Sequence, residues 1–192
     1  MKNIILASQS PRRKELLALL DLKFTIEIKA VDEVYPDNLN YTQVAEYLAK
    51  LKASAFKNIE NDQLIITADT VVVLEGRILG KPKDKTEAIR MLESLSSKSH
   101  QVITGVCLTS KDKQISFSST TKVFFKKLSS LEIDYYIEHY KPYDKAGSYG
   151  IQEWIGAIGI TKIEGSYFNV VGLPIQELNE QLKEFTYSPK FA

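Results

Sequence analysis

The sequence predicts an α/β fold built on a mixed β-sheet. In the first half of the chain, strand patterns and helix patterns alternate, which is typical of parallel strands joined by helices. In the second half, two strand patterns flank a short polar turn at residues 111–113, which predicts an antiparallel hairpin. The length of 192 residues suits one domain, or two small lobes that share a core, so both kinds of pairing are expected within one mixed sheet.

The composition is that of an ordinary globular protein, with 44% hydrophobic and 26% charged residues. The net charge is +1, so no global field favours DNA, RNA or an anionic membrane. Neither a nucleic acid nor a membrane is therefore expected as a partner. No run approaches the roughly 20 apolar residues of a membrane-spanning helix, and the apolar start is too short for a signal peptide. The single cysteine, Cys107, lies in an apolar run and is expected to be a buried core residue. The absence of a second cysteine for a disulfide favours a reducing, cytoplasmic location.

In the first half, Ser10 is the expected N-cap of a helix whose first residue is Pro11. The pair Glu46–Lys50 has the i,i+4 spacing that supports a second helix. Glu75-Gly76 is expected to turn between two strands. The expected elements are strands at 2–8, 23–30, 64–74 and 77–79 and helices from Ser10 and over 42–57.

In the second half, Thr86 is the expected N-cap of a helix that buries Ile89, Leu92 and Leu95. Ser129 and Glu132 form a capping box at the start of another helix. The glycine-rich segment 143–173 is expected to contain a loop, a strand, a turn at Glu164-Gly165 and a second strand. Pro174 opens a last helix, and the tail after Phe185 has little pattern and is expected to be loose.

The stretch "SQSPRR" places two arginines, Arg12 and Arg13, in the first turn of a helix, where the helix dipole disfavours cations. A strand followed by a short loop and a helix start is a common anion site, because free backbone N–H groups point outward there. The hydroxyls of Ser8 and Ser10 lie beside them, and an arginine can grip a phosphate with two hydrogen bonds. A bound phosphate would explain the arginines; the alternative is that both are solvated surface residues.

Asp69 is a lone carboxylate within the apolar run "LIITADTVVVL". Burying an unpaired charge costs several kcal/mol, so Asp69 either faces a cleft or is paired with a cation or metal. The alternative is a turn aspartate that divides two short strands, although Asp-Thr is a weak turn signal without glycine.

Two further residues are candidates on weaker patterns. In "LGKPKD", Pro82 biases Lys81 toward an extended backbone that holds its side chain out, although most lysines are simply solvated. In "YDKAGSYGIQ", the amide of Gln152 can donate one hydrogen bond and accept another, which complements the edge of uracil or thymine. The alternative for Gln152 is a polar residue in a surface turn.

Several common site patterns are missing from the sequence. It has no GxxxxGK[ST] loop, no CxxC pair, no GxSxG elbow and no GxGxxG after a strand. With only His100 and His139, a His-rich metal site is excluded. A hard cation held by carboxylates remains open.

The motifs taken together resemble the Maf family of nucleoside triphosphate pyrophosphatases. The resemblance covers residues 4 to about 182 and includes the following segments in order: "LASQSPRRKELL", "VDE", "LAKLKA", "TADTVVVL", "LGKP", "HQVITGV", "YDKAGSYGIQ" and "GSYFNVVGLP". It implies an elongated, twisted mixed sheet flanked by helices around a deep central cleft, as in inosine triphosphatase-like proteins. Residues 1–192 would then form one domain with two lobes, often assembled as a homodimer. Where some members have "LSGK", this chain has "LSSK", with Ser97 in place of glycine.

The resemblance also implies an activity: cleavage of a nucleoside triphosphate to the monophosphate and pyrophosphate with a divalent cation. One subgroup acts on dTTP and UTP and carries Arg, Thr and Gln at three base-specificity positions, which fall here on Arg12, Thr70 and Gln152. Another subgroup acts on 7-methyl-GTP and typically replaces the arginine and the glutamine, often by Trp and Glu. This chain matches the dTTP/UTP pattern at all three positions.

The remaining roles are also implied by the resemblance. Glu33 and Asp69 would bind Mg²⁺ or Mn²⁺, with Asp69 as the proton acceptor for the attacking water. The residues expected to hold the triphosphate are Ser8, Ser10, Arg13, Lys52 and Lys81. Two alternatives stay open: an inosine/xanthosine-type triphosphate pyrophosphatase, and a non-catalytic nucleotide-binding regulator of cell division.

Overall fold

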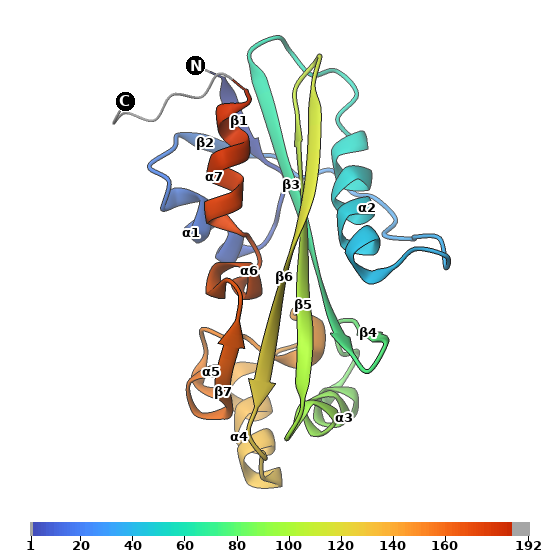
Figure 1. Ribbon diagram of the computed structural model, residues 1–192, viewed down its shortest axis with the longest axis vertical. Coiled ribbons are helices and arrows are strands. Elements are labelled where there is room, and N and C mark those ends of the chain that lie inside the picture. Colours follow the sequence, from blue (N-terminus) through green and yellow to red (C-terminus); the bar gives the residue numbers. More distant parts are fainter. Residues whose placement is uncertain (1, 186–192) are drawn as a thin grey trace. The chain divides into compact units, whose positions relative to one another are not determined.

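A computed structural model describes residues 2–185 and confirms the mixed α/β fold (Figure 1). Seven strands form one sheet in the order β2-β1-β3-β5-β6-β7, with β4 paired to β3 beside this path. The strands are β1 (Asn3–Leu6), β2 (Phe24–Ile26), β3 (Gln63–Leu74), β4 (Arg77–Leu79), β5 (Ser99–Thr109), β6 (Gln114–Phe125) and β7 (Ile160–Glu164). The β1 strand is parallel to β2 and β3, whereas β3–β4 and β6–β7 are antiparallel.

The helices follow mostly the expected order. They are α1 (Pro11–Ala18), α2 (Tyr41–Ser54), α3 (Lys85–Leu95), α4 (Ser130–Tyr140), α5 (Trp154–Gly159), α6 (Tyr167–Val171) and α7 (Ile175–Lys183), with a 3₁₀ turn η1 (Ala146–Ser148). The predicted N-cap Ser10 and the predicted capping box of Ser129 and Glu132 are confirmed. The predicted pair Glu46–Lys50 is an ion pair of 2.9 Å.

The chain divides into two compact units. The first comprises the chain up to Asp69, Thr104–Ser119 and the chain from Gly172, and the second comprises Thr70–Ile103 and Thr120–Val171. In the first unit, α2 covers one face of the sheet and α1 and α7 cover the other (Figure 1). In the second unit, α3, α4 and α5 bury one apolar core that includes Leu92, Ile133 and Ile155. The central cleft expected between two lobes stays a prediction.

The close packing of α2 in the first unit has a specific sequence cause. A Cβ atom at Gly105 of β5 would lie 2.3 Å from the backbone of Ala45, so only glycine allows this approach. The hydroxyl of Thr67 on β3 donates a hydrogen bond of 2.7 Å to the carbonyl of Ala49, one turn further along α2. Small residues and one buried hydrogen bond therefore fix α2 against the sheet.

Three predicted features are wrong in detail. The strand expected at 23–30 spans only Phe24–Ile26, because it pairs with β1 alone at the edge of the sheet and leaves Ile28 exposed. The N-cap of α3 is Asp84 and not Thr86, because Asp84 accepts a hydrogen bond from the backbone N–H of Glu87. A strand after Glu164-Gly165 does not form, because that segment contains α6.

Tertiary contacts explain why α6 forms in a segment rich in β-branched and aromatic residues. The hydroxyl of Ser166 accepts a hydrogen bond from the backbone N–H of Asn169, which caps the helix. The fully buried side chain of Asn169 donates to the carbonyl of Val102 and to the hydroxyl of Thr121. The short helix α5 was likewise unexpected, since its sequence "WIGAIG" contains two glycines.

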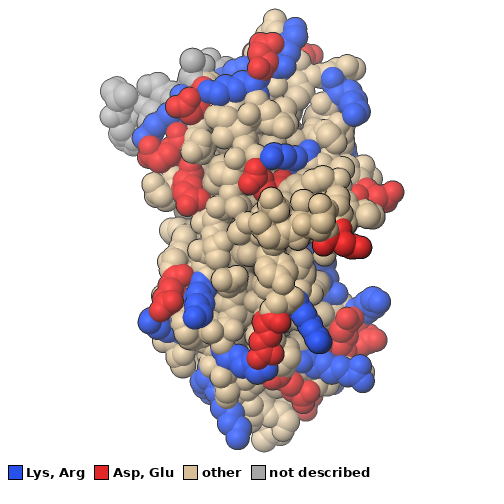
Figure 2. All heavy atoms as spheres, turned by 45° about the vertical axis from the view of Figure 1, so that its right-hand side comes forward, with Lys and Arg blue, Asp and Glu red and all other residues tan. Residues whose placement is uncertain are grey.

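Charges of both signs are interspersed on the face of the molecule shown in Figure 2. This pattern agrees with the net charge of +1. Between residues 2 and 185, no helix combines the length and the apolar character that crossing a bilayer requires. The expectation of a loose tail after Phe185 lies outside the described residues.

Candidate active site

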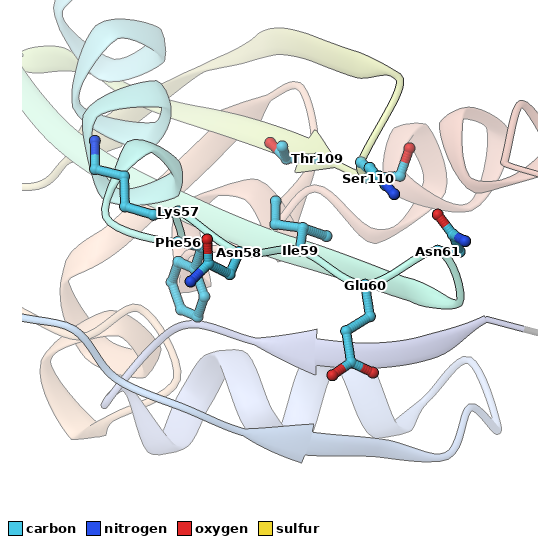
Figure 3. Close-up of a pocket in the computed structure, with 9 residues that line it drawn as sticks. Phe56, Lys57, Asn58, Ile59, Glu60, Asn61, Thr109 and Ser110 are labelled. Carbon is cyan, nitrogen blue, oxygen red and sulfur yellow. The ribbon is translucent and has the colours of Figure 1, made fainter.

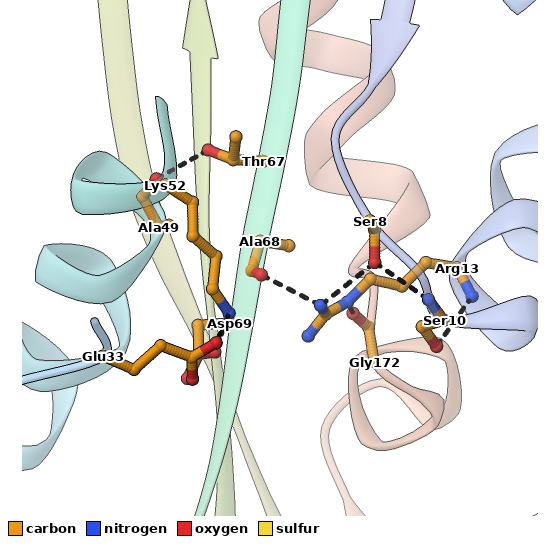
Figure 4. Close-up of polar contacts among 10 residues, drawn as sticks. All are labelled: Ser8, Ser10, Arg13, Glu33, Ala49, Lys52, Thr67, Ala68, Asp69 and Gly172. Carbon is orange, nitrogen blue, oxygen red and sulfur yellow. Dashed lines mark hydrogen bonds and ion pairs between the residues drawn. The ribbon is translucent and has the colours of Figure 1, made fainter. Parts of the chain in front are cut away.

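The loop between β1 and α1 arranges two hydroxyls and one arginine around the start of a helix (Figure 4). Ser10 caps α1 by accepting a hydrogen bond of 3.5 Å from the backbone N–H of Arg13. Ser8, which is buried, accepts from the backbone N–H of Ser10 at 3.2 Å and from Nη1 of Arg13 at 3.4 Å. The predicted phosphate residues Ser8, Ser10 and Arg13 therefore lie together at the positive end of a helix dipole.

Arg13 is fixed by backbone carbonyls from two distant segments. Its Nε donates to the carbonyl of Gly172 at 2.8 Å, and its Nη1 donates to the carbonyl of Ala68 at 2.9 Å. Burial lowers the pKa of Arg13, whereas the nearby carboxylate of Asp69 raises it. Since three hydrogen bonds of its guanidinium go to protein acceptors, Arg13 organises the loop in addition to any contact with a phosphate.

Arg12 precedes Arg13 on α1 and is half-buried. The expected division, with Arg13 at the phosphate and Arg12 at the base, stays a prediction.

Lys52 joins the two predicted metal-binding carboxylates (Figure 4). Its ammonium Nζ lies 2.5 Å from Oδ1 of Asp69 and 3.1 Å from Oε1 of Glu33. The side chains of Asp69 and Lys52 are 12% and 18% exposed, whereas that of Glu33 is 51% exposed. Asp69 therefore lies within β3 and not in a turn. It is paired with the ammonium of Lys52, which is one of the two arrangements expected for a carboxylate in an apolar run.

The close packing of α2 explains how Lys52 reaches Asp69. Lys52 lies three residues after Ala49, whose carbonyl is held by Thr67. Thr67 and Asp69 are separated by one residue on β3, so both side chains point to the face that α2 covers. The sequence pattern alone showed Lys52 only as an ordinary exposed helix lysine.

The donor set fits a hard divalent cation such as Mg²⁺ or Mn²⁺. Oxygens of Glu33 and Asp69 already converge on one positive charge, the ammonium of Lys52. Within the described part of the chain, no three His, Cys, Asp or Glu side chains cluster as a metal site. A cation bound here would therefore take its other ligands from phosphates and water, which is how Mg²⁺ commonly binds.

The other predicted residues, Thr70, Lys81 and Gln152, belong to the second unit. Thr70 follows Asp69 on β3 and is half-buried. Lys81 is exposed, and the carbonyl of the preceding Gly80 accepts a hydrogen bond of 3.0 Å from the backbone N–H of Gly147. This bond ties the "LGKP" segment to the loop that leads to Gln152.

Gln152 is exposed in a tight turn between Ile151 and the half-buried Glu153. The backbone N–H of Glu153 donates to the carbonyl of Gly150 at 3.0 Å, which closes the turn. Ile151 is buried, and Glu153 is the N-cap residue of α5. Glu153 is not among the site residues predicted from the sequence. The only feature of the sequence that could have indicated it is its position next to Gln152.

A pocket of about 750 Å³ lies elsewhere in the first unit (Figure 3). It is lined by residues 56–61 between α2 and β3 and by residues 109–111 at the β5–β6 turn. None of the predicted site residues lines it, and its charged side chains, Lys57, Glu60 and Lys111, are of both signs.

The fold and the site define an α/β protein in which a helix start with two hydroxyls and an arginine lies in the same unit as two carboxylates that pair with a lysine. The chain belongs to the Maf family: the family profile described as "Maf-like protein" matches residues 3–185.

Several relatives are similar over nearly their whole length. A protein of Phocaeicola vulgatus named dTTP/UTP pyrophosphatase is 56% identical over 183 residues, which are 94% of this chain and 95% of the relative. Proteins of the same name from Porphyromonas gingivalis and Christiangramia forsetii are 53% and 50% identical, and each alignment covers at least 94% of both chains.

A solved structure described as a HAM1 protein from Coxiella burnetii shares the fold. Its TM-score is 0.55 at 15% sequence identity, and the match covers 96% of this chain and 100% of the other. At this identity the likeness concerns the fold alone.

Proposed function

We propose that the protein hydrolyses dTTP and UTP, and modified pyrimidine nucleotides with the same base edge, to the nucleoside monophosphate and pyrophosphate. The observation that carries the proposal is the convergence of Glu33, Lys52 and Asp69 in the same unit as the Ser8–Arg13 anion loop. The names and the high identity of the relatives support the substrate class.

The triphosphate binds at the start of α1, where Ser8, Ser10 and Arg13 provide hydroxyls and positive charge. Glu33 and Asp69 would hold the divalent cation. When bound, the cation neutralises phosphate charge and makes a nearby water more acidic. Lys52, which pairs with these carboxylates in the structure, is then available to the phosphates.

The chemical step is attack of water on the α-phosphorus. Asp69 accepts the proton of this water. A bond forms between the water oxygen and the α-phosphorus, and the bond from the α-phosphorus to the bridging oxygen breaks. Pyrophosphate leaves with that electron pair, and its developing charge is stabilised by Arg13, Lys52 and Lys81.

The base is read by Arg12, Thr70 and Gln152. The amide of Gln152 donates to the O4 carbonyl of uracil or thymine and accepts from the N3–H group.

A cytoplasmic homodimer is the proposed form of the enzyme.

Turnover of a nucleotide panel tests the substrate assignment. We expect UTP and dTTP to be cleaved with Mg²⁺ or Mn²⁺ at a higher kcat/KM than CTP, GTP or ITP. Preference for ITP would favour the inosine/xanthosine-type enzyme, and tight binding of nucleotides without turnover would favour a regulator.

A further inference from the structure

A glutamine amide does not by itself distinguish uracil from cytosine. Uracil and thymine present a carbonyl acceptor beside an N–H donor, whereas cytosine presents an amino donor beside a nitrogen acceptor. A half-turn of the amide exchanges its C=O and NH₂ groups and so converts a complement of uracil into a complement of cytosine. A uracil-selective site based on Gln152 therefore needs a neighbour that fixes the direction of the amide.

The structure places a carboxylate oxygen of Glu153 and the amide nitrogen of Gln152 near the same point beside the backbone of Gly150. A Cβ atom at Gly150 would lie 2.9 Å from Oε2 of Glu153 and 3.0 Å from Nε2 of Gln152, so both atoms border the same small space. A negative charge attracts the N–H end of an amide and repels its carbonyl. We propose that Glu153 is a positioning residue that holds Gln152 in the direction suited to uracil and thymine.

Glu153 is itself held at both carboxylate oxygens. Its Oε2 accepts a hydrogen bond from the hydroxyl of Tyr136, and its Oε1 lies 3.1 Å from Nζ of Lys145. Tyr136 is fully buried on α4, and Lys145 is 8% exposed. The same hydroxyl of Tyr136 accepts a hydrogen bond of 3.0 Å from the backbone N–H of Gly150. Burial and the adjacent Glu153 raise the pKa of Tyr136, so it remains a proton donor to the carboxylate.

The backbone on both sides of Gln152 is also fixed. A Cβ atom at Gly156 of α5 would lie 1.9 Å from the carbonyl oxygen of Ile151, so α5 packs directly on the turn. Together with the bond between Glu153 and Gly150, this contact restrains the turn and leaves the side-chain torsions of Gln152 as its main freedom. The negative charge of Glu153 favours one of the two orientations of the Gln152 amide.

The inference rests on the proposed function, because it takes Gln152 to be the base-reading residue. The test measures kcat/KM for UTP and for CTP in Glu153→Gln, which keeps the shape but removes the charge. We expect kcat/KM for UTP to fall and that for CTP to rise, with the UTP/CTP ratio reduced roughly tenfold, since one well-directed hydrogen bond is lost to one base and gained by the other. Tyr136→Phe, which keeps the Glu153–Lys145 pair, is expected to shift the ratio in the same direction by less.

Ile133→Val is the matched control, because Ile133 is buried on the same helix as Tyr136 but makes no polar contact with the turn. It is expected to lower the thermal midpoint and to leave the UTP/CTP ratio unchanged. Equal losses for UTP and CTP in Glu153→Gln would overturn the positioning role. If Glu153→Gln does not fold, Tyr136→Phe decides by the same two outcomes.

Gln152→Ala separates this inference from the function on which it rests. If Gln152→Ala abolishes the preference for UTP while Glu153→Gln and Tyr136→Phe keep it, only the positioning role is overturned. If Gln152→Ala keeps the preference, the base-reading role of Gln152 fails and the positioning role fails with it.

Discussion

At the residue scale, local sequence chemistry indicated most candidate side chains but not their partners. Asp69 stood out because a carboxylate in an apolar strand needs a cation, and the structure provides Lys52. The anchoring of Arg13 to the carbonyl of Gly172 links residues 159 positions apart, and no local pattern encodes such a contact. Glu33 and Lys52 were found through family resemblance, since each looked like an ordinary polar surface residue.

The role of Asp69 as proton acceptor gives the first prediction. Asp69→Asn is expected to lower kcat by about 10²- to 10⁴-fold, the usual contribution of a general base, while nucleotide affinity is retained. Single-turnover kinetics and equilibrium binding of UTP measure the two effects separately. Asp134→Asn, at an exposed position on α4, is the control, and near-normal turnover of Asp69→Asn would refute the role.

His100 gives a prediction about pH. It is 2% exposed against Tyr149 and Phe125, and burial lowers its pKa from 6.5 to about 4. Between these values the unfolded chain binds a proton that the folded chain does not, so the free energy of unfolding falls as the pH falls from 6.5 to 4. The slope contributed by this group is at most about 1.4 kcal/mol per pH unit.

Denaturant titrations at several pH values measure this slope. His100→Phe is expected to reduce the slope between pH 6.5 and 4, and His139→Phe, at the other histidine, is the control. An identical slope in His100→Phe and the wild type would show that His100 is not its source.

At the element scale, α1, α4 and α7 are predictable because each carries a start signal in its sequence, whereas α2 is predictable from helical spacing and the pair Glu46–Lys50. The predicted start of α3 and the predicted strand in place of α6 are wrong, in each case where two signals compete. Asp84 and Thr86 can both cap a helix, and Asp84 prevails because Glu87 then lies at the third helical position, where it also accepts from the backbone N–H of Lys83. In α6, the buried hydrogen bonds of Asn169 override the strand preference of its neighbours.

Gly105 allows α2 to pack closely against β5. Gly105→Ala is expected to lower the free energy of unfolding by at least about 2 kcal/mol, because the added methyl group would clash with the backbone of Ala45. Any folded fraction should also lose activity, since α2 carries Lys52. Chemical denaturation measures the first effect. Gly80→Ala is the control because a Cβ there meets nothing within 4 Å, and equal stability of the two variants would contradict the packing role.

Ser97 is the position where this chain departs from the glycine of some family members. Its φ of 61° lies in the left-handed region that favours glycine. Ser97→Gly is therefore expected to raise the free energy of unfolding by about 0.5 to 1 kcal/mol. The neighbouring Ser96→Gly is the contrasting variant, since it removes the hydroxyl that accepts from the backbone N–H of Leu128. Destabilisation by Ser97→Gly would rule out relief of strain.

At the scale of the whole molecule, the predicted site residues divide between the two units. The first unit holds the Ser8–Arg13 loop, the carboxylates and Lys52, and the second holds Thr70, Lys81 and Gln152. The mixed sheet was predictable because strand patterns, turns and helix spacings agreed with one another. Contacts such as Tyr136–Glu153 were not predictable, because a buried tyrosine on a helix looks like any other core residue in the sequence.

The central claim is that water attacks the α-phosphorus of a pyrimidine nucleoside triphosphate. The most direct measurement is hydrolysis of UTP in ¹⁸O-labelled water with Mg²⁺, followed by mass spectrometry of the products. We expect UMP and pyrophosphate, with one ¹⁸O atom in UMP and none in pyrophosphate. Label in pyrophosphate, or formation of UDP and phosphate, would contradict the claim.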